Sequence, residues 1–316
     1  YGDQVEVSFS THHWPTWGNE RIVNYWEAQR DMYRYLHDQT LHLANRGLTP
    51  DEIAEEMKLP ASLASQFNCR GYYGTLSHKA QYDLYFGWFD GNPAHLNPLP
   101  PSELGAKYVE AIGGADKVLE VAKASYAKGE YRWVATLLDN LVFAEPENKE
   151  ARQLLADTYS QLGYQAESGP WRNFYLTGAQ DLFKKNVPYT SKLINDGVLS
   201  QMDMGTLLDY CAIQLNGEKA GGKEAVININ FTDTKEKVML MLNNGVLNHR
   251  LGSQDKKADL TMEIAKMDFV KLFFGRTDLQ TLHKTNKVKT TGDTKAIDII
   301  RSACEPADPN FNIVLP

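Results

Sequence analysis

The 316-residue sequence predicts an α+β chain built from several domains. Residues 100–178 carry apolar side chains at helical spacing, whereas alternating strand patterns dominate after residue 225. The balance of charge also changes along the chain. The first 184 residues hold 16 basic and 24 acidic side chains, and the remainder hold 17 basic and 16 acidic. These changes indicate a domain boundary near residue 185.

The overall composition excludes several classes of protein. A hydrophobic content of 42% and a charged content of 23% are typical of a globular domain. The net charge of −7 argues against non-specific binding to nucleic acid. We expect no membrane span, because no apolar run approaches the ~20 residues that one requires. Three widely spaced cysteines predict neither a disulfide framework nor a cysteine-based zinc site: Cys69, Cys211 and Cys304.

The first segment combines a short strand with two histidines. Val5–Ser10 alternates like a strand, and His12 and His13 follow before Pro15 turns the chain. Such a histidine is a candidate metal ligand or proton carrier, although most histidine pairs are structural. Because the sequence opens inside a strand, without an initiator Met or a signal peptide, we expect it to be the remainder of a longer polypeptide.

Two helices and an aromatic stretch come next. Residues 20–46 have helical spacing, and Thr49 ahead of a proline predicts the start of a short helix. Arg70–Leu96 is rich in aromatic and histidine residues, with glycine and proline turns at both ends. Such a composition is typical of a pocket wall. It is equally typical of a core in which the polar tips of Tyr and Trp are hydrogen-bonded. Within the stretch, His78 follows Ser77, where a polar group can face a ligand.

Helices are predicted throughout the middle of the chain. Ser102 is the expected N-cap of the first, and the predicted helices cover residues 103–112, 116–128, 131–144 and 149–162. Similar segments begin at Tyr126 and Tyr159, a spacing of 33 that is close to the tetratricopeptide period. Two such units are too few to form a solenoid. These helices must therefore bury a face against the preceding domain or against a second subunit.

The last segment, residues 185–316, is predicted to be an α+β domain. Strands are expected at 225–232, 237–243, 246–251 and 258–264, a basic strand and turn at 287–295, and helices at 202–215, 266–275 and 296–304. Asn244-Gly245 is a strong hairpin signal between two of these strands. A group of soft apolar side chains suits either a lipid-binding cavity or an ordinary core: Met239, Met241, Met262, Met267, Phe269, Phe273 and Phe274.

Two stretches resemble the alkyl sulfatases of the metallo-β-lactamase superfamily. The first is HHWPTWGNE at residues 12–20, and the second, at residues 70–96, contains RGYYGTLSH and YDLYFGWFDGNPAHL. The resemblance continues from residue 169 with GPWRNFYLTGAQDL. It implies a dizinc enzyme that hydrolyses sulfate esters of fatty alcohols such as dodecyl sulfate. The family's His-x-His-x-Asp-His cluster, two glutamates and sulfate-binding Asn and Arg have no counterpart in this sequence. The resemblance therefore predicts a C-terminal half that needs an upstream metal-binding half.

The resemblance also assigns roles to two residues. His12 matches the family's last zinc ligand, and two zinc ions are expected per complete site. His78 matches the histidine that contacts the substrate sulfate, where it would donate to a sulfate oxygen or protonate the departing alkoxide as a general acid. Tyr72, Tyr82 and Trp88 are expected to line the substrate pocket. The family pattern has about two more residues between His78 and Tyr82 than this chain.

Three domains follow from these observations. Residues 1–97 are expected to be the end of a metallo-β-lactamase αββα catalytic domain, and residues 98–184 an all-α, tetratricopeptide-like dimerisation domain. Residues 185–316 resemble the sterol-carrier-protein fold, which holds aliphatic chains in an apolar tunnel. We expect a periplasmic or secreted homodimer that acts on alkyl sulfates. The alternative is a non-catalytic, dimeric lipid-binding protein that lacks an intact metal site.

Overall fold

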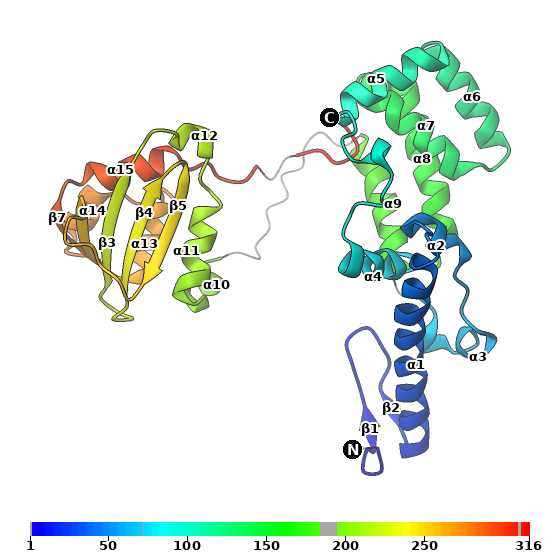
Figure 1. The fold of residues 1–316 in the computed structure, drawn as a ribbon, viewed down its shortest axis with the longest axis horizontal. Helices are drawn as coiled ribbons and strands as arrows, with labels where there is room; N and C mark the ends of the chain where they lie inside the picture. The colour runs from blue at the N-terminus through cyan, green and yellow to red at the C-terminus, as the bar shows by residue number, and fades with distance from the viewer. Residues whose placement is uncertain (1, 72, 184–194, 309–310) are drawn as a thin grey trace. The chain divides into compact units, whose positions relative to one another are not determined.

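The chain divides into two compact units. A computed structural model describes residues 2–71, 73–183, 195–308 and 311–316. The first unit comprises Tyr1–Asn186 together with Asn312–Pro316, and the second comprises Val187–Phe311 (Figure 1). The mixture of a helical unit and a helix-and-strand unit confirms the predicted α+β, multidomain class. No helix in the described part of the chain is long and apolar enough to cross a membrane.

The first part of unit 1 is organised around one long helix. Its elements are β1 (Val7–Ser8), β2 (Thr16–Trp17), α1 (Asn19–Ala44), α2 (Pro50–Glu56), α3 (Ala61–Ala64), η1 (Phe67–Cys69), α4 (Leu76–Phe86) and η2 (Pro93–His95). Thr49 forms the predicted N-cap of α2, as half of a capping box with Glu52. The predicted strand over residues 5–10 was too long. Only Val7 and Ser8 pair, with Trp17 and Thr16, and Phe9 stays 80% exposed.

Five helices complete unit 1: α5 (Pro101–Ile112), α6 (Ala115–Ala127), α7 (Tyr131–Ala144), α8 (Lys149–Gln165) and α9 (Gly169–Asp181). Helix α7 is central, because it packs on α5, α6 and α8 and buries Val134, Leu138 and Leu141 completely. The prediction that Ser102 caps the first helix is wrong. Pro100 is the N-cap and Pro101 opens the helix, since a proline at the first position loses no hydrogen bond.

Two close contacts fix how unit 1 packs. A Cβ on Gly105 of α5 would lie 2.4 Å from the backbone oxygen of Asn140 in α7, so only glycine allows the two helices to approach this closely.

The last residues of the chain also belong to unit 1. Val314 and Leu315 pack against the helical core, and Val314 lies near Gly178 of α9. The chain therefore leaves unit 1 after α9 and returns to it at its end.

Unit 2 is a five-stranded sheet with helices on one face (Figure 1). Its elements are α10 (Asp196–Gln201), α11 (Met204–Ala212), α12 (Gly217–Ala220), β3 (Ala225–Phe231), β4 (Lys237–Asn243), β5 (Val246–Leu251), β6 (Leu260–Ile264), α13 (Lys266–Phe273), α14 (Leu279–Lys284), β7 (Val288–Gly292) and α15 (Lys295–Ser302). The strand order is β5-β4-β3-β6-β7, and only β3 and β6 are parallel. Asn244 and Gly245 have φ of 53° and 73°, as the predicted two-residue hairpin requires.

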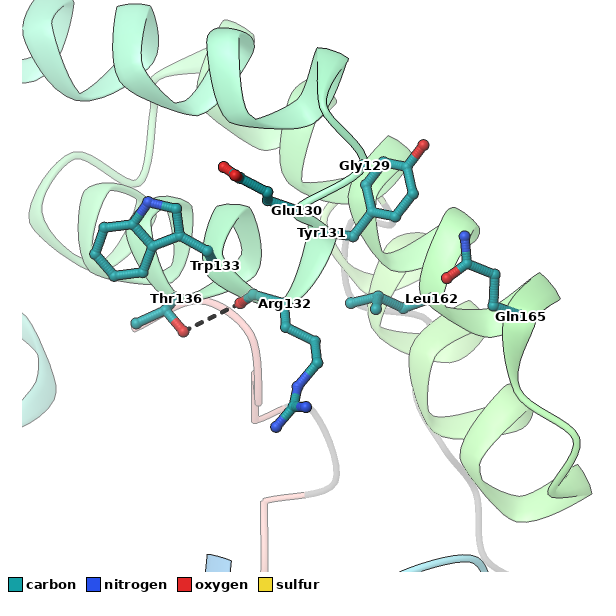
Figure 2. Close-up of a pocket in the computed structure, with 8 residues that line it drawn as sticks. All are labelled: Gly129, Glu130, Tyr131, Arg132, Trp133, Thr136, Leu162 and Gln165. Atoms are coloured by element: carbon teal, nitrogen blue, oxygen red, sulfur yellow. Dashed lines mark hydrogen bonds between the residues drawn. The ribbon is translucent and has the colours of Figure 1, made fainter. Parts of the chain in front are cut away.

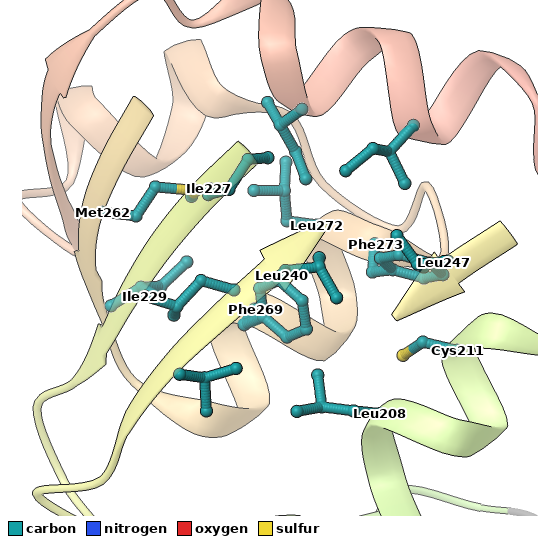
Figure 3. Packing of buried hydrophobic residues seen from close by; sticks show 14 of the residues in the cluster. Leu208, Cys211, Ile227, Ile229, Leu240, Leu247, Met262, Phe269, Leu272 and Phe273 are labelled. Atoms are coloured by element: carbon teal, nitrogen blue, oxygen red, sulfur yellow. The ribbon is translucent and has the colours of Figure 1, made fainter. Parts of the chain in front are cut away.

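The core of unit 2 lies between the sheet and its helices. Alternate residues of β3 face this core, among them Ile227 and Ile229 (Figure 3). Phe269 of α13 packs edge-on against Phe231. Met262, Phe269 and Phe273 are core residues, so the core interpretation holds for them. Met239 and Met241 alternate with the core-facing Leu240 along β4 and therefore point to the other face of the sheet.

Candidate active-site segment

Helix α4 carries the two predicted site residues that the structure brings together. His78 and Tyr82 are its buried residues, 8% and 9% exposed, and they lie four residues apart on one helical face. Tyr82 packs its ring 4.8 Å from Phe86, one turn further on. The helix ends at Gly87, whose φ of 76° only glycine adopts readily. It runs without a break from His78 to Tyr82.

Polar contacts hold α4 and its preceding loop in place. On α1, His37 donates from Nδ1 to the Asp38 carboxylate at 2.7 Å, which leaves Nε2 to accept from the Tyr85 hydroxyl at 2.8 Å. Hydrogen bonds from His37 and Arg34 lower the pKa of Asp38. Lys79 of α4 forms an ion pair with Asp51 of α2. These contacts position the helix and leave its buried histidine out of the network.

The imidazole of His78 is buried without a hydrogen-bond partner for Nδ1 among the described residues. Burial lowers its pKa, because desolvation disfavours the charged imidazolium. In this chain the ring is therefore neutral near pH 7, with one N–H to donate and one lone pair to accept. A buried polar atom without a partner is costly, so its persistence points to a ligand or to a further element that completes the hydrogen bond.

Two further polar groups share this environment, and sequence reasoning gave them no role. Gln81 Nε2 on α4 and Trp171 Nε1 on α9 are also buried without a partner in the described part of the chain. The Trp171 ring lies against the loop before α4, where a Cβ on Gly74 would sit 3.3 Å from it. Arg70 and Glu167 join the same two segments through a 2.6 Å ion pair. The signal for this contact was Gly74, because glycine often marks a close approach.

The structure separates the two N-terminal histidines. His13 packs 4.8 Å from the Tyr25 ring, and its Nδ1 donates to the Trp14 backbone oxygen at 2.8 Å. His12 is exposed, and its φ of 68° is unusual for a residue with a side chain. Backbone strain of this kind is frequent at functional sites. Of the pair, His12 is therefore the more exposed, on an unusual backbone conformation.

The remaining predicted pocket residues are not part of a closed site. Trp88 is 71% exposed beyond the end of α4, and Tyr72 lies outside the described residues. Other aromatic side chains of this segment are exposed as well: Phe9, Trp14, Trp17, Phe67, Tyr73, Tyr85 and Phe86. Large exposed apolar surface usually marks an interface. The segment therefore exposes much apolar surface in this chain.

The described residues bring no metal centre together. Among the residues that the structure describes, no group of three or more His, Cys, Asp or Glu side chains could hold a metal ion. A structural or catalytic zinc ion needs three or four protein ligands.

A pocket among the helices of unit 1 lacks the features of an active site. It has a volume of about 610 Å³ at the turn between α6 and α7. Its lining residues include two charged side chains, Glu130 and Arg132, which point away from each other (Figure 2). Arg132 instead pairs with Glu55 at 2.8 Å. Because these groups do not converge, the α4 segment remains the better candidate.

Known proteins match the whole chain. The model of the alkyl sulfatase dimerisation family covers residues 49–185, and that of the alkyl sulfatase C-terminal family covers residues 192–316. This chain belongs to the alkyl sulfatase family. A linear primary-alkylsulfatase from Pseudomonas sp is 46% identical over 320 residues, which are 100% of this chain and 47% of the relative. The alkyl/aryl-sulfatase BDS1 of Saccharomyces cerevisiae is 41% identical, over 100% of this chain and 49% of its own length.

A solved alkyl sulfatase shares the fold. The stereoselective inverting sec-alkylsulfatase Pisa1 from Pseudomonas sp. is 41% identical with a TM-score of 0.93, over 100% of this chain and 50% of that one. This chain thus spans about half the length of the alkyl sulfatases that it matches. The predicted family is confirmed.

The dimerisation model begins at residue 49, within the segment 1–97, and the domain boundary at residues 97–98 stays a prediction. Among the described residues of that segment, β1 and β2 form the only sheet, so an αββα sandwich is not part of this chain.

Proposed function

We propose that this chain is the C-terminal half of a zinc-dependent alkyl sulfatase. The complete enzyme hydrolyses alkyl sulfate esters, such as dodecyl sulfate, to an alcohol and sulfate, and takes part in detergent degradation. The identity of 46% to a linear primary-alkylsulfatase along the whole chain carries this proposal. The unpartnered, buried His78 beside exposed aromatic side chains supports it, because sulfate and an alkyl tail need such neighbours.

His12 is the proposed zinc ligand of this chain. Its exposed imidazole, on a left-handed residue between β1 and β2, suits donation to a metal held mainly by other residues. Two zinc ions, when bound in the complete enzyme, would activate a water molecule and orient the sulfate. The described residues do not fit a complete zinc site.

His78 is the proposed proton donor to the substrate. A neutral imidazole carries one N–H, and a buried one donates strongly to an anionic oxygen. A bound sulfate would raise the pKa of His78, opposing the lowering caused by burial. The imidazolium could then protonate the departing alkoxide. Tyr82 packs beside it on the same helix face, and Trp88 and Tyr72 are proposed to contact the alkyl chain.

The proposed partners are an upstream catalytic half and a second copy of this chain. The exposed aromatic residues around α4 would be covered by the catalytic half. A separate apolar groove of about 560 Å³, lined mainly by α5, α6 and α7, lies within the residues matched by the dimerisation model. Tyr108 and Trp133 are each 49% exposed there. We assign this α5–α7 groove to the homodimer interface.

Unit 2 is proposed to bind the aliphatic part of the substrate, as its resemblance to sterol carrier proteins suggests. Its sheet and helices enclose an apolar core. The enzyme is proposed to act in the periplasm or outside the cell.

The test uses the native polypeptide that contains these 316 residues. Its intact mass, its zinc content and its rate of dodecyl sulfate hydrolysis should be measured on one preparation. We expect a mass well above the 35.7 kDa of this chain, two zinc ions per polypeptide, and loss of hydrolysis on treatment with a chelator. A metal-free, inactive polypeptide that still binds lipid would instead favour the non-catalytic alternative.

A further inference from the structure

A small pocket in unit 2 combines an aromatic wall with a guanidinium group. It has a volume of about 220 Å³ and lies where the ends of α13 and α15 meet the segment after α11. Its lining includes Phe273 and Phe274 at the end of α13, and Arg301 and Cys304 at the end of α15. The rings of Phe273 and Phe274 meet edge to face, with centroids 5.4 Å apart.

Arg301 has an unsatisfied donor at this pocket. Its Nε is buried and has no acceptor among the residues that the structure describes. Its nearest carboxylate is that of Asp298, at 3.7 Å from Nη1, and Asp298 is 67% exposed. A pair at this distance, with one partner in solvent, holds the guanidinium weakly. Part of the side chain, 24%, remains open to a ligand.

The other charge at the pocket is already neutralised. Glu305 also lines the pocket, but its carboxylate forms an ion pair with Lys219 and accepts from Asn216 Nδ2 at 2.9 Å. The pocket therefore presents a weakly paired cationic group beside two aromatic rings. An oxyanion placed beside Arg301 would satisfy Nε and a neighbouring Nη together, in the bidentate geometry that carboxylates and sulfates adopt with arginine, after a small rotation of the side chain.

We propose that this pocket binds the anionic head and first carbons of a short amphiphile, with its carboxylate or sulfate on Arg301 and its carbons against Phe274. The volume lies below the ~300 Å³ at which drug-sized pockets begin, so a longer chain would extend out of it. The site is independent of the α4 segment. It concerns binding by unit 2 and does not rest on the proposed hydrolysis.

The experiment measures binding by calorimetry to the whole 316-residue chain. The probes are hexanesulfonate and hexanoate, which contain no sulfate ester and cannot be hydrolysed, with inorganic sulfate and 1-hexanol as comparisons. Arg301→Gln removes the charge and keeps a side chain of similar shape. Arg250→Gln is the matched control, because Arg250 is an exposed arginine of β5 in the same unit. Thermal unfolding of each variant shows whether its fold is intact.

We expect both hexyl anions to bind the native chain and Arg250→Gln equally, and Arg301→Gln about tenfold or more weakly. Inorganic sulfate and hexanol should each bind more weakly than hexanesulfonate. Equal affinity of Arg301→Gln and the native chain would overturn the proposal, as would inorganic sulfate binding as tightly as hexanesulfonate. If Arg301→Gln does not fold, Arg301→Lys replaces it, since lysine keeps the charge but not the planar pair of donors of the guanidinium group. An unchanged affinity of that variant would also overturn the proposal. Failure of the α4 segment to bind sulfate would leave these results unaffected.

Discussion

Replacing Gly105 by alanine is expected to destabilise the protein, although the same change inside a helix ordinarily stabilises it. Gly105 lies in α5, where alanine would gain about 0.8–1.0 kcal/mol in helix propensity. Against this gain, the new Cβ would lie 2.4 Å from the Asn140 oxygen and 3.3 Å from the Ala144 nitrogen of α7. Carbon and oxygen normally approach to about 3.3 Å, so the helices must separate by roughly 0.9 Å.

The cost of that separation exceeds the gain. Overpacking a core typically costs about 1–3 kcal/mol, and here the clash is with backbone, which no side-chain rotation relieves. A value near the upper end, less the propensity gain, leaves a net loss of about 1–2 kcal/mol of unfolding free energy. Helix α7 carries this loss directly, because Leu138 and Leu141 beside the contact are completely buried.

Urea unfolding followed by tryptophan fluorescence measures the effect, since every tryptophan of this chain lies in unit 1. Gly169→Ala is the control. A Cβ there meets nothing within 4 Å at the first residue of α9, so its stability should stay within about 0.5 kcal/mol of the native value. The reasoning fails if Gly105→Ala is as stable as the native protein or more stable than it.

Four further outcomes are expected. In the complete enzyme, His12→Ala should remove one of two zinc ions and nearly all sulfatase activity, as measured by metal analysis and by hydrolysis of dodecyl sulfate. Burial lowers the pKa of His78 in the folded protein. The free energy of unfolding is therefore highest above the unfolded pKa near 6.5 and falls as the pH drops towards the folded pKa. His78→Gln should reduce this loss of stability in unfolding experiments between pH 7 and 5. Trp133→Glu should shift the protein from dimer to monomer in sedimentation, because it places a charge in the α5–α7 groove. Replacing residues 187–311 with a Gly/Ser linker should raise KM for dodecyl sulfate more than for hexyl sulfate, since each buried CH₂ contributes ~0.8 kcal/mol.

Two of these outcomes have a contrary result, and the other two have a matched control. Unchanged zinc content in His12→Ala would move the metal ligand to His13 or remove it from this chain. His42→Gln changes an exposed histidine of α1 and should leave the acid loss of stability in place. Tyr164→Glu changes an aromatic side chain that is 71% exposed outside the groove, and it should remain dimeric. An equal rise in KM for both sulfates would show that unit 2 does not handle the tail.

Elements with a strong local signal could be predicted from sequence almost to the residue. Helix Tyr131–Ala144 and strands Lys237–Asn243 and Val246–Leu251 have the predicted bounds. The helix has a regular apolar stripe, and the strands are joined by a two-residue turn whose geometry Asn-Gly favours. The strand predicted at residues 5–10 failed because alternation alone does not provide a partner. Its apolar side chains Val7 and Phe9 remain exposed in the described structure.

The site could be predicted only in part, because its decisive features are long-range. The motif residues His78 and Tyr82 share one buried helix face, as a four-residue spacing implies. Sequence could not distinguish His12 from His13, since the difference lies in one backbone angle and in the ring of Tyr25. The unpartnered nitrogen of Trp171 depends on packing between segments almost one hundred residues apart in the chain, which no local pattern reveals.

The return of the chain end to unit 1 affects the order in which the protein can fold during synthesis. Val314 and Leu315 complete the packing of a helical core whose other members all precede residue 187. Ribosomes add about 5–20 residues per second, so this core waits roughly 6–26 s for its last two side chains while unit 2 is being made. Unit 2 therefore emerges complete before unit 1 does. A single proteolytic cut on either side of unit 2 would leave it covalently attached through the other connection.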